Sequence, residues 1–109
     1  MTKKLNIATD FSKYPGGRFV DDGPFSGQLF REDFLAPLLV ANEKIEINMD
    51  GVRGYGSSFL EEAFGGLVRK GFECKTLLSK LVFISKNPSI KMEIEEYIKL
   101  AGEKENQAH

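Results

Sequence analysis

The sequence contains one cysteine, Cys74, one histidine, His109 at its last position, and no tryptophan. A single cysteine excludes an internal disulfide. With one histidine at the end of the chain, the sequence also lacks a Cys/His zinc motif and an interior histidine that could act as a general base. Because no histidine is available to activate its thiol, Cys74 is interpreted as a half-buried small residue rather than as a nucleophile.

Long apolar runs and an excess of one charge are absent as well. No run approaches the ~20 residues of a membrane-spanning helix, and the N-terminal stretch MTKKLNIATDF lacks the apolar region of a signal peptide. The formal net charge is -1, with acidic and basic residues interspersed, so no basic stripe favours nucleic acid or an anionic membrane. We therefore expect a cytoplasmic protein that binds neither nucleic acid nor a membrane.

What remains is the composition of an ordinary globular protein. Apolar residues make up 41% of the chain and charged residues 28%, as in soluble folded domains. A chain of 109 residues is long enough to bury one core and too short for two domains. We therefore expect a single domain over residues 1–109.

Periodicity predicts alternating strands and helices in the first half of the chain. Residues 4–11 (KLNIATDF) alternate apolar and polar side chains and are predicted to form the first strand. Residues 12–27 are rich in glycine, proline and aspartate and are predicted to form turns, with GRFV as a short second strand. Ser26 is predicted to cap a helix over residues 26–42, which Pro37 kinks or interrupts. The apolar residues at helical spacing in this helix are Phe30, Phe34, Leu38 and Ala41.

The second half continues the alternation. In residues 44–51 (KIEINMDG) the apolar side chains Ile45, Ile47 and Met49 share one face, which predicts a strand covered by helices on one side only. The next helix is predicted over residues 57–70, and Gly71 ends it. Its apolar stripe consists of Leu60, Ala63, Phe64, Leu67 and Val68. The apolar run KLVFIS over 80–85 predicts the central strand, and a last helix is predicted over 88–101, with EKENQAH fraying after it.

The stretch GYGSSFLEEAFGG, residues 54–66, places two glycines and two serines before a helix. Ser58 and Glu61 have the spacing of a capping box, so Ser58 is interpreted as structural. Ser57 lacks that role and is predicted to be displayed at the helix N-terminus, where backbone amides favour an added phosphate by about 0.3–1 kcal/mol. Because Glu61 and Glu62 oppose that phosphate, we expect a modification of Ser57 to change a binding surface rather than fold stability.

Gly65 and Gly66 lie inside this predicted helix, where each glycine costs about 0.8–1 kcal/mol relative to alanine. On a helical wheel both lie away from the apolar stripe, beside Glu62 and Arg69. Either another surface approaches the bare backbone there, or residues 72–79 of the same chain pack over it. Phe59, at the edge of that face, is interpreted either as a rim residue of the core or as a partner contact.

A strand (IEINMDGV), a turn, the triplet GSS and a helix are together similar to the central motif of the STAS domain, the sulfate transporter and anti-sigma factor antagonist fold. With PGGRF, DDGPFSGQLFR and GYGSSFLEEAFGGLVRKGF, the chain more specifically resembles, over residues 10–71, a STAS-like bacterial family of unknown function. In better-known STAS domains the turn reads Asp-Ser-Ser-Gly, and its first serine is phosphorylated by a partner kinase that is also an anti-sigma factor, which breaks the complex. The resemblance assigns this role to Ser57, although Gly56 and Phe59 replace the aspartate and the glycine.

The expected fold is therefore α/β, a STAS-like mixed sheet of about four strands with about three helices mainly on one face. The expected function is that of a small non-enzymatic regulatory module resembling an anti-sigma factor antagonist. The resemblance implies a protein partner of the histidine-kinase-like ATPase class, and homodimer formation is left open. No catalytic residue, metal or cofactor is expected, and Ser57 is the phosphorylation candidate. The predicted partner-binding residues are Gly54, Tyr55, Gly56, Ser57, Phe59, Glu62, Gly65, Gly66 and Arg69.

One alternative comes from a different class of protein: a small enzyme or ligand-binding domain that uses the 54–58 loop and helix N-terminus as an anion or nucleotide site. A dinucleotide fingerprint is disfavoured, because Phe59 stands at its third glycine position and the chain is small. Several acidic and basic residues could form a polar site for a metal or a phosphate, but local hydrogen bonds in turns are the favoured interpretation. These residues are Asp10, Asp21, Asp22, Asp50, Arg18 and Arg31.

Overall fold

The computed structural model describes residues 2–107 and contains a three-stranded parallel sheet in the order β1-β2-β3. The strands are β1 (Thr2–Asn6), β2 (Lys44–Asn48) and β3 (Leu81–Ile84). In the register, Leu5 of β1 lies opposite Ile47 of β2, which lies opposite Phe83 of β3. The prediction that residues 80–85 form the central strand is therefore wrong, because β2 is central and β3 is an edge strand.

The parallel arrangement follows from the connections. A helical segment over residues 27–41 joins β1 to β2, and a second over residues 57–69, followed by α5 (Cys74–Lys80), joins β2 to β3. Each crossover returns the chain to the same end of the sheet, so successive strands point the same way. The predicted mixed sheet of about four strands is wrong for residues 2–107. GRFV does not pair as a strand: Val20–Asp22 form a 3₁₀ turn, and the carboxylate of Asp22 accepts the N–H of Phe19 at 2.8 Å.

β1 ends at Asn6, earlier than predicted. Ile7–Phe11 form a π-helical turn. The Asn6 side chain accepts the N–H of Thr9 at 3.3 Å, and the Asp10 carboxylate accepts the N–H of Asn6 at 2.8 Å. Such local side-chain bonds compete with the hydrogen bonds of a sheet, which explains why the alternating pattern does not continue as a strand.

The first helical segment consists of α1 (Gly27–Phe30), a π-helical turn (Arg31–Leu35) and α2 (Ala36–Ala41). Its predicted cap is confirmed, since the hydroxyl of Ser26 accepts the N–H of Leu29 at 3.1 Å. The segment runs close to its predicted bounds of 26–42.

The π-helical turn changes which face of this segment is buried. The wider turn moves the fully buried positions to Leu35 and Leu39, whereas the predicted Phe34 and Leu38 are only partly buried. Pro37 lies in the first turn of α2, where its missing N–H is tolerated, so the helical path continues past it.

The second helical segment consists of α3 (Ser57–Leu60), a π-helical turn (Glu61–Gly65) and α4 (Gly66–Arg69). All five residues of the predicted stripe are buried, namely Leu60, Ala63, Phe64, Leu67 and Val68. Gly71 follows with a φ of 109°, a left-handed conformation that favours glycine, so the predicted end is confirmed.

Two helical features differ from the sequence-based expectation. α5 was not predicted, although its Leu77 is fully buried in the core. α6 (Pro88–Gln107) extends beyond the predicted 88–101, so the expected fraying is wrong up to residue 107, while residues 108–109 lie outside the described residues. None of the helices formed by residues 2–107 has both the length and the apolar content to cross a membrane.

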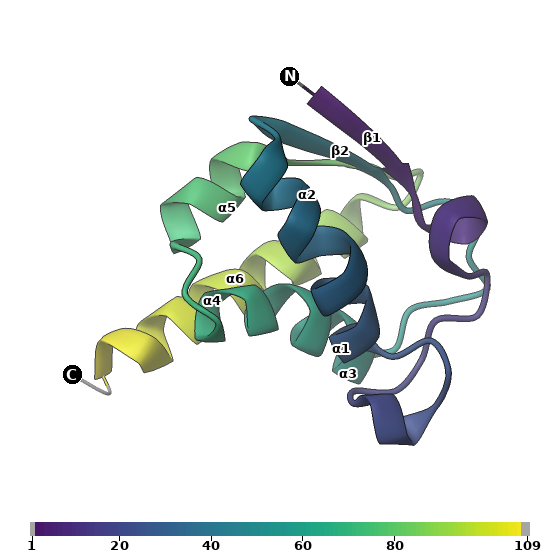
Figure 1. Cartoon of the computed structure of the whole chain (residues 1–109), viewed down its shortest axis with the longest axis horizontal. Helices are drawn as coiled ribbons and strands as arrows, with labels where there is room; N and C mark the ends of the chain where they lie inside the picture. Colours follow the sequence, from purple (N-terminus) through teal and green to yellow (C-terminus); the bar gives the residue numbers. More distant parts are fainter. Residues whose placement is uncertain (1, 108–109) are drawn as a thin grey trace.

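The helices gather on one side of the sheet (Figure 1). Ile45, Ile47 and Met49 are at most 2% exposed on the covered face, which confirms the one-sided burial of β2. On the opposite face, Val82 and Ile84 are exposed. Several phenylalanine rings pack in the core, with centroids 4.9 Å apart for Phe11 and Phe30.

Candidate functional site

The junction between β2 and the second helical segment is open at its tip and anchored at its base. Its exposed residues are Gly51, Arg53, Gly54, Gly56, Ser57 and Ser58. Tyr55 is half-buried, and its hydroxyl donates to the carbonyl of Met49 at 2.7 Å. Burial, with a smaller contribution from the charge of Asp50, raises the pKa of Tyr55, so this hydroxyl remains protonated. The N–H of Arg53 donates to the carbonyl of Lys13 at 2.9 Å, which ties the loop to the N-terminal turns.

Neither serine caps the helix. The N-cap is Gly56, with an extended backbone (φ -74°, ψ 147°), and its carbonyl accepts the N–H of Leu60 at 3.2 Å. Ser57 and Ser58 therefore occupy the first two helical positions. The predicted capping box of Ser58 and Glu61 is wrong, because the cap falls one residue before the serines and Arg18 and Arg69 hold the Glu61 carboxylate.

Four of the predicted partner-binding residues lie inside the protein. Phe59 is fully buried, Glu62 is 6% exposed, and Gly65 and Gly66 are also buried. The π-helical turn Glu61–Gly65 packs against both α1 and α6, so the face predicted to be open is turned inward. The prediction that these four residues form an exposed binding face is therefore wrong. Of the predicted set, Gly54, Gly56, Ser57 and Arg69 are exposed and Tyr55 is half-buried, and Arg69 is paired with Glu61.

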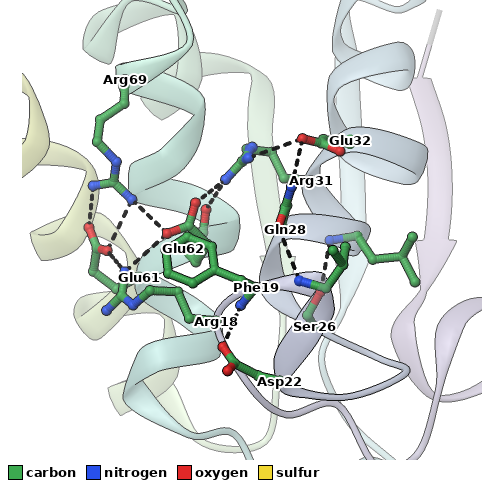
Figure 2. Close-up of polar contacts among 12 residues, drawn as sticks. Arg18, Phe19, Asp22, Ser26, Gln28, Arg31, Glu32, Glu61, Glu62 and Arg69 are labelled. Atoms are coloured by element: carbon green, nitrogen blue, oxygen red, sulfur yellow. Dashed lines mark hydrogen bonds and ion pairs between the residues drawn. The ribbon is translucent and has the colours of Figure 1, made fainter.

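That inward face carries an arginine–glutamate cluster, which we define as Arg18, Arg31, Arg69, Glu61 and Glu62. In Figure 2, Glu62 lies between Arg31 on one side and Arg18 and Arg69 on the other. Arg18 Nη1 lies 2.5 Å from Glu61 Oε1 and 3.1 Å from Glu62 Oε1. Arg69 binds Glu61 with both terminal nitrogens, at 2.7 and 3.1 Å. The cluster thus joins the 12–26 turns to both helical segments.

Arg31 and Glu62 form the buried part of the cluster. Arg31 is 3% exposed, and it donates to the Glu62 carboxylate and, at 2.9 Å, to the Glu62 carbonyl. A second carboxylate, that of Glu32, lies 3.5 Å from Arg31 Nη2. A buried guanidinium requires such partners, because an unpaired charge in the interior is strongly unfavourable.

The outer part of the cluster consists of Arg18, Arg69 and Glu61, and it is held in its charged state. Burial disfavours the charge of Glu61, but hydrogen bonds from Arg69 and Arg18 outweigh it and hold the pKa of Glu61 below its ordinary value. The hydrogen bond to Glu61 in turn raises the pKa of Arg18 and of Arg69. Arg18 in the 12–26 turns and Glu61 and Arg69 in the second helical segment therefore stay ionised together.

Glycines make room for this cluster. A side chain on Gly66 would overlap the Arg31 guanidinium, and one on Gly65 would overlap the Glu61 carboxylate. At Gly27 the two helical segments approach so closely that a Cβ atom would lie 2.5 Å from the carbonyl oxygen of Phe59. The predicted close approach to the bare helix backbone is thus made by side chains of this chain rather than by residues 72–79. The double glycine was the sequence signal of the cluster, but it did not identify the arginine that fills the space.

A cleft of about 840 Å³ opens over the cluster, and we call it the arginine cleft. The cluster residues form one part of its lining, together with Lys70 and Lys104. Phe19, Tyr97 and Leu100 contribute apolar surface. The hydroxyl of Tyr97 donates to Glu93 at 2.6 Å, and this hydrogen bond, with burial, raises the pKa of Tyr97 to about 12.

A smaller cavity of about 430 Å³ lies at the carboxyl ends of β2 and β3. Its polar lining includes Asp50, Tyr55, Ser85, Lys86, Asn87 and Glu93. The carboxylate of Asp50 accepts the N–H of Lys86 at 3.0 Å, which links the ends of the two strands. Ser57 does not line this cavity.

The predicted local hydrogen bonds in turns are found for Asp10 and Asp22, whereas Asp50, Arg18 and Arg31 bind residues that are distant in the sequence. Asp10, Asp22 and Asp50 each accept a backbone N–H, and Arg18 and Arg31 belong to the cluster. Cys74 is half-buried as predicted, and its thiol lies 3.1 Å from the carbonyl of Ile98. Among residues 2–107, no three His, Cys, Asp or Glu side chains gather in a way that could hold a metal ion.

These elements define a small α/β domain. Its parallel sheet has the helices on one face, and β2 leads through an exposed glycine–serine loop into a helix. The family model for the STAS-like domain of unknown function (DUF4325) matches residues 26–91, more than half of the chain. The chain therefore belongs to this STAS-like family. No curated protein and no solved structure gives a significant match.

Proposed function

We propose that this STAS-like domain is a non-enzymatic regulatory module that binds a protein partner through the 54–58 loop, and that phosphorylation of Ser57 releases the partner. The observation that carries the proposal is the position of Ser57. It is exposed at the first turn of a helix, and its side chain does not cap that helix. A hydroxyl without a capping role can be modified without loss of the fold.

The loop is presented on a rigid base. Phe59 and Leu60 follow the serines directly and are fully buried, so they fix the start of the helix on the core. Tyr55 fixes the other side of the loop through its hydrogen bond to Met49. A partner would therefore meet a preformed surface, which lowers the entropy cost of binding.

The charges near Ser57 are compatible with a phosphate switch. The carboxylates of Glu61 and Glu62, which follow the serines in the same helix, are already paired with arginines. They therefore oppose an added phosphate less than free carboxylates would. A phosphate on Ser57 would add about two negative charges at the centre of the loop surface. Repulsion and desolvation at the interface would then weaken the complex while the fold stays intact.

The class of the partner is proposed from the resemblance to anti-sigma factor antagonists. It is a histidine-kinase-like ATPase, which would both bind the loop and phosphorylate Ser57. The binding surface is narrower than the sequence suggested, because Phe59, Glu62, Gly65 and Gly66 are buried. We assign it to the exposed residues of the 54–58 loop.

Calorimetry against a histidine-kinase-like ATPase encoded beside this gene tests the proposal. Ser57→Asp should weaken binding about tenfold or more, a loss of roughly 1.4 kcal/mol. It should leave the thermal midpoint nearly unchanged, because a carboxylate is tolerated at a helix N-terminus. Ser79→Asp, which places the same charge on an exposed serine of α5, is the control and should bind like the wild type.

Phosphorylation is tested separately. Incubation with the same ATPase and ATP should add one phosphate to the wild type and none to Ser57→Ala, as measured by mass spectrometry. If the wild type binds no such ATPase, or if Ser57→Asp binds as well as Ser79→Asp, the regulatory proposal fails.

One observation favours a second candidate function, that of a small ligand-binding domain or enzyme. The 430 Å³ cavity lies beside the carboxyl ends of two parallel strands, where ligands bind in many open α/β sheets. Gly54 and Tyr55 of the loop line it, but Ser57 does not. Titration with a nucleotide, followed by amide NMR, would support this function if residues 50–55 and 85–90 shift saturably, and would exclude nucleotides if they do not.

A further inference from the structure

The arginine cleft carries more positive than negative charge. Five cationic and three anionic side chains line it, which leaves an excess of two positive charges. The cations are Arg18, Arg31, Arg69, Lys70 and Lys104, and the anions are Glu32, Glu61 and Glu62. All three carboxylates are paired with arginines, whereas within residues 2–107 neither lysine forms an ion pair. The excess charge therefore sits on Lys70 and Lys104.

Hydrogen-bond donors in the cleft are only partly used. Within the described part of the chain, the bonds of Arg18 all leave from Nη1. The edge formed by its Nε and Nη2 is therefore open for the paired hydrogen bonds that a guanidinium makes to an oxyanion. At the floor, Arg31 is 3% exposed, and its Nε has no hydrogen-bond partner among the described residues. Buried N–H groups without an acceptor are rare, so this atom marks an incomplete polar site.

The other part of the lining is apolar. Phe19 is 50% exposed and Leu100 is 43% exposed, and both line the cleft together with the ring of Tyr97. Large side chains of this kind on a free surface are typical of binding sites when charged groups converge beside them. The volume of about 840 Å³ lies within the range of small-molecule pockets, which is roughly 300–1,000 Å³.

We propose that the arginine cleft binds a phosphate monoester that carries an aromatic or other apolar body. The dianionic phosphate matches the two uncompensated lysine charges and would accept hydrogen bonds from the open edge of Arg18. The apolar body would lie against Phe19, Tyr97 and Leu100. Glu61 and Glu62 do not prevent this, because their oxygens already accept hydrogen bonds from arginines. The 54–58 loop does not line the cleft, so this site is independent of the proposed function.

Amide NMR titration of the full chain with phenyl phosphate tests the proposal, with inorganic phosphate and phenol as the two partial probes. Phenyl phosphate should shift residues 18–19, 69–70 and 97–104 saturably. Inorganic phosphate should bind the same residues about tenfold more weakly, because it lacks the ring, and phenol should not bind saturably, because it lacks the charge. Equal affinity for phenyl phosphate and inorganic phosphate would contradict the apolar half of the site.

Two double variants with the same change in net charge distinguish binding in the cleft from a general electrostatic effect. Lys70→Gln with Lys104→Gln should weaken phenyl phosphate binding about tenfold or more without unfolding, since neither lysine is paired with another described residue. Lys44→Gln with Lys91→Gln changes two exposed lysines outside the cleft and should bind like the wild type. The proposal is overturned if phenyl phosphate does not bind saturably, if it shifts other residues instead, or if both double variants lose the same affinity.

Discussion

The guanidinium of Arg31 occupies the space that a side chain on Gly66 would fill. Arg31 belongs to the first helical segment and Gly66 to the second, so this contact lets the two segments close over a buried ion pair. It explains why a helix in the core keeps a residue of low helix propensity.

Gly66→Ala should destabilise the protein by about 1–3 kcal/mol, because the new methyl group overlaps Arg31. Helix propensity alone predicts the opposite, a gain of about 0.8–1 kcal/mol. Chemical denaturation decides between them. Gly54→Ala is the control, because no described residue lies within 4 Å of its added Cβ, and it should change stability by less than about 0.5 kcal/mol. A stabilised Gly66→Ala variant would show that Arg31 can move aside at no cost.

Glu62→Ala should cost about 3–5 kcal/mol of unfolding free energy, because it leaves the guanidinium of Arg31 buried without its main partner. Glu32→Ala removes a carboxylate from the same guanidinium, but its side chain is 48% exposed and its loss should cost at most about 1 kcal/mol. Urea denaturation of the two variants provides the comparison. Similar losses would mean that the buried pair does not set the stability of this region.

Ser26→Ala should cost about 0.5–2 kcal/mol, because the buried hydroxyl of Ser26 caps the first helical segment. Ser58→Ala should change stability by less than about 0.5 kcal/mol, since Ser58 is exposed and does not cap the second. Thermal and chemical denaturation of both variants would test this contrast. A large loss for Ser58→Ala would restore the capping box that the sequence suggested.

Acid should weaken the outer part of the cluster. The folded-state pKa of Glu61 is lowered, so the unfolded chain binds this proton more readily than the folded protein. The resulting stabilisation is present above the ordinary glutamate pKa of about 4.3 and is lost as the pH falls through the folded-state pKa. Between about pH 6 and about pH 3, the unfolding free energy of Glu61→Gln should therefore fall less steeply than that of the wild type. Parallel pH profiles from urea denaturation would contradict this role of Glu61.

Local sequence patterns predicted the features that depend on residues close together in the chain. The alternation of Ile45, Ile47 and Met49 predicted the buried face of β2, and the stripe from Leu60 to Val68 predicted the buried face of the second helical segment. Ser26 caps the first helical segment, as the sequence predicted. These signals are local, because a residue two or four positions away in the sequence lies on the same face of a strand or a helix.

Other features depend on contacts between distant segments. The apolar run at residues 81–84 is typical of a central strand, but in the sheet formed by residues 2–107 β2 pairs on both sides and β3 lies at an edge. The π-helical turn Arg31–Leu35 shifted the buried positions of the first segment by one residue, to Leu35 and Leu39. The serines were misassigned because the N-cap is Gly56, two residues before Ser58, where the spacing of a capping box places it.

The sequence by itself determined the family, the one-sided burial of the sheet and the exposure of Ser57, since a motif, a period of two and a turn rich in glycine are properties of neighbouring residues. Only the tertiary structure decided that Gly65 and Gly66 face inward and that Glu61 and Glu62 bind arginines. Arg18, Arg31 and the two glutamates come from separate segments, and their charges meet only after the helices have packed. Coulombic attraction and the exclusion of water depend on distance in space, which local sequence patterns do not record.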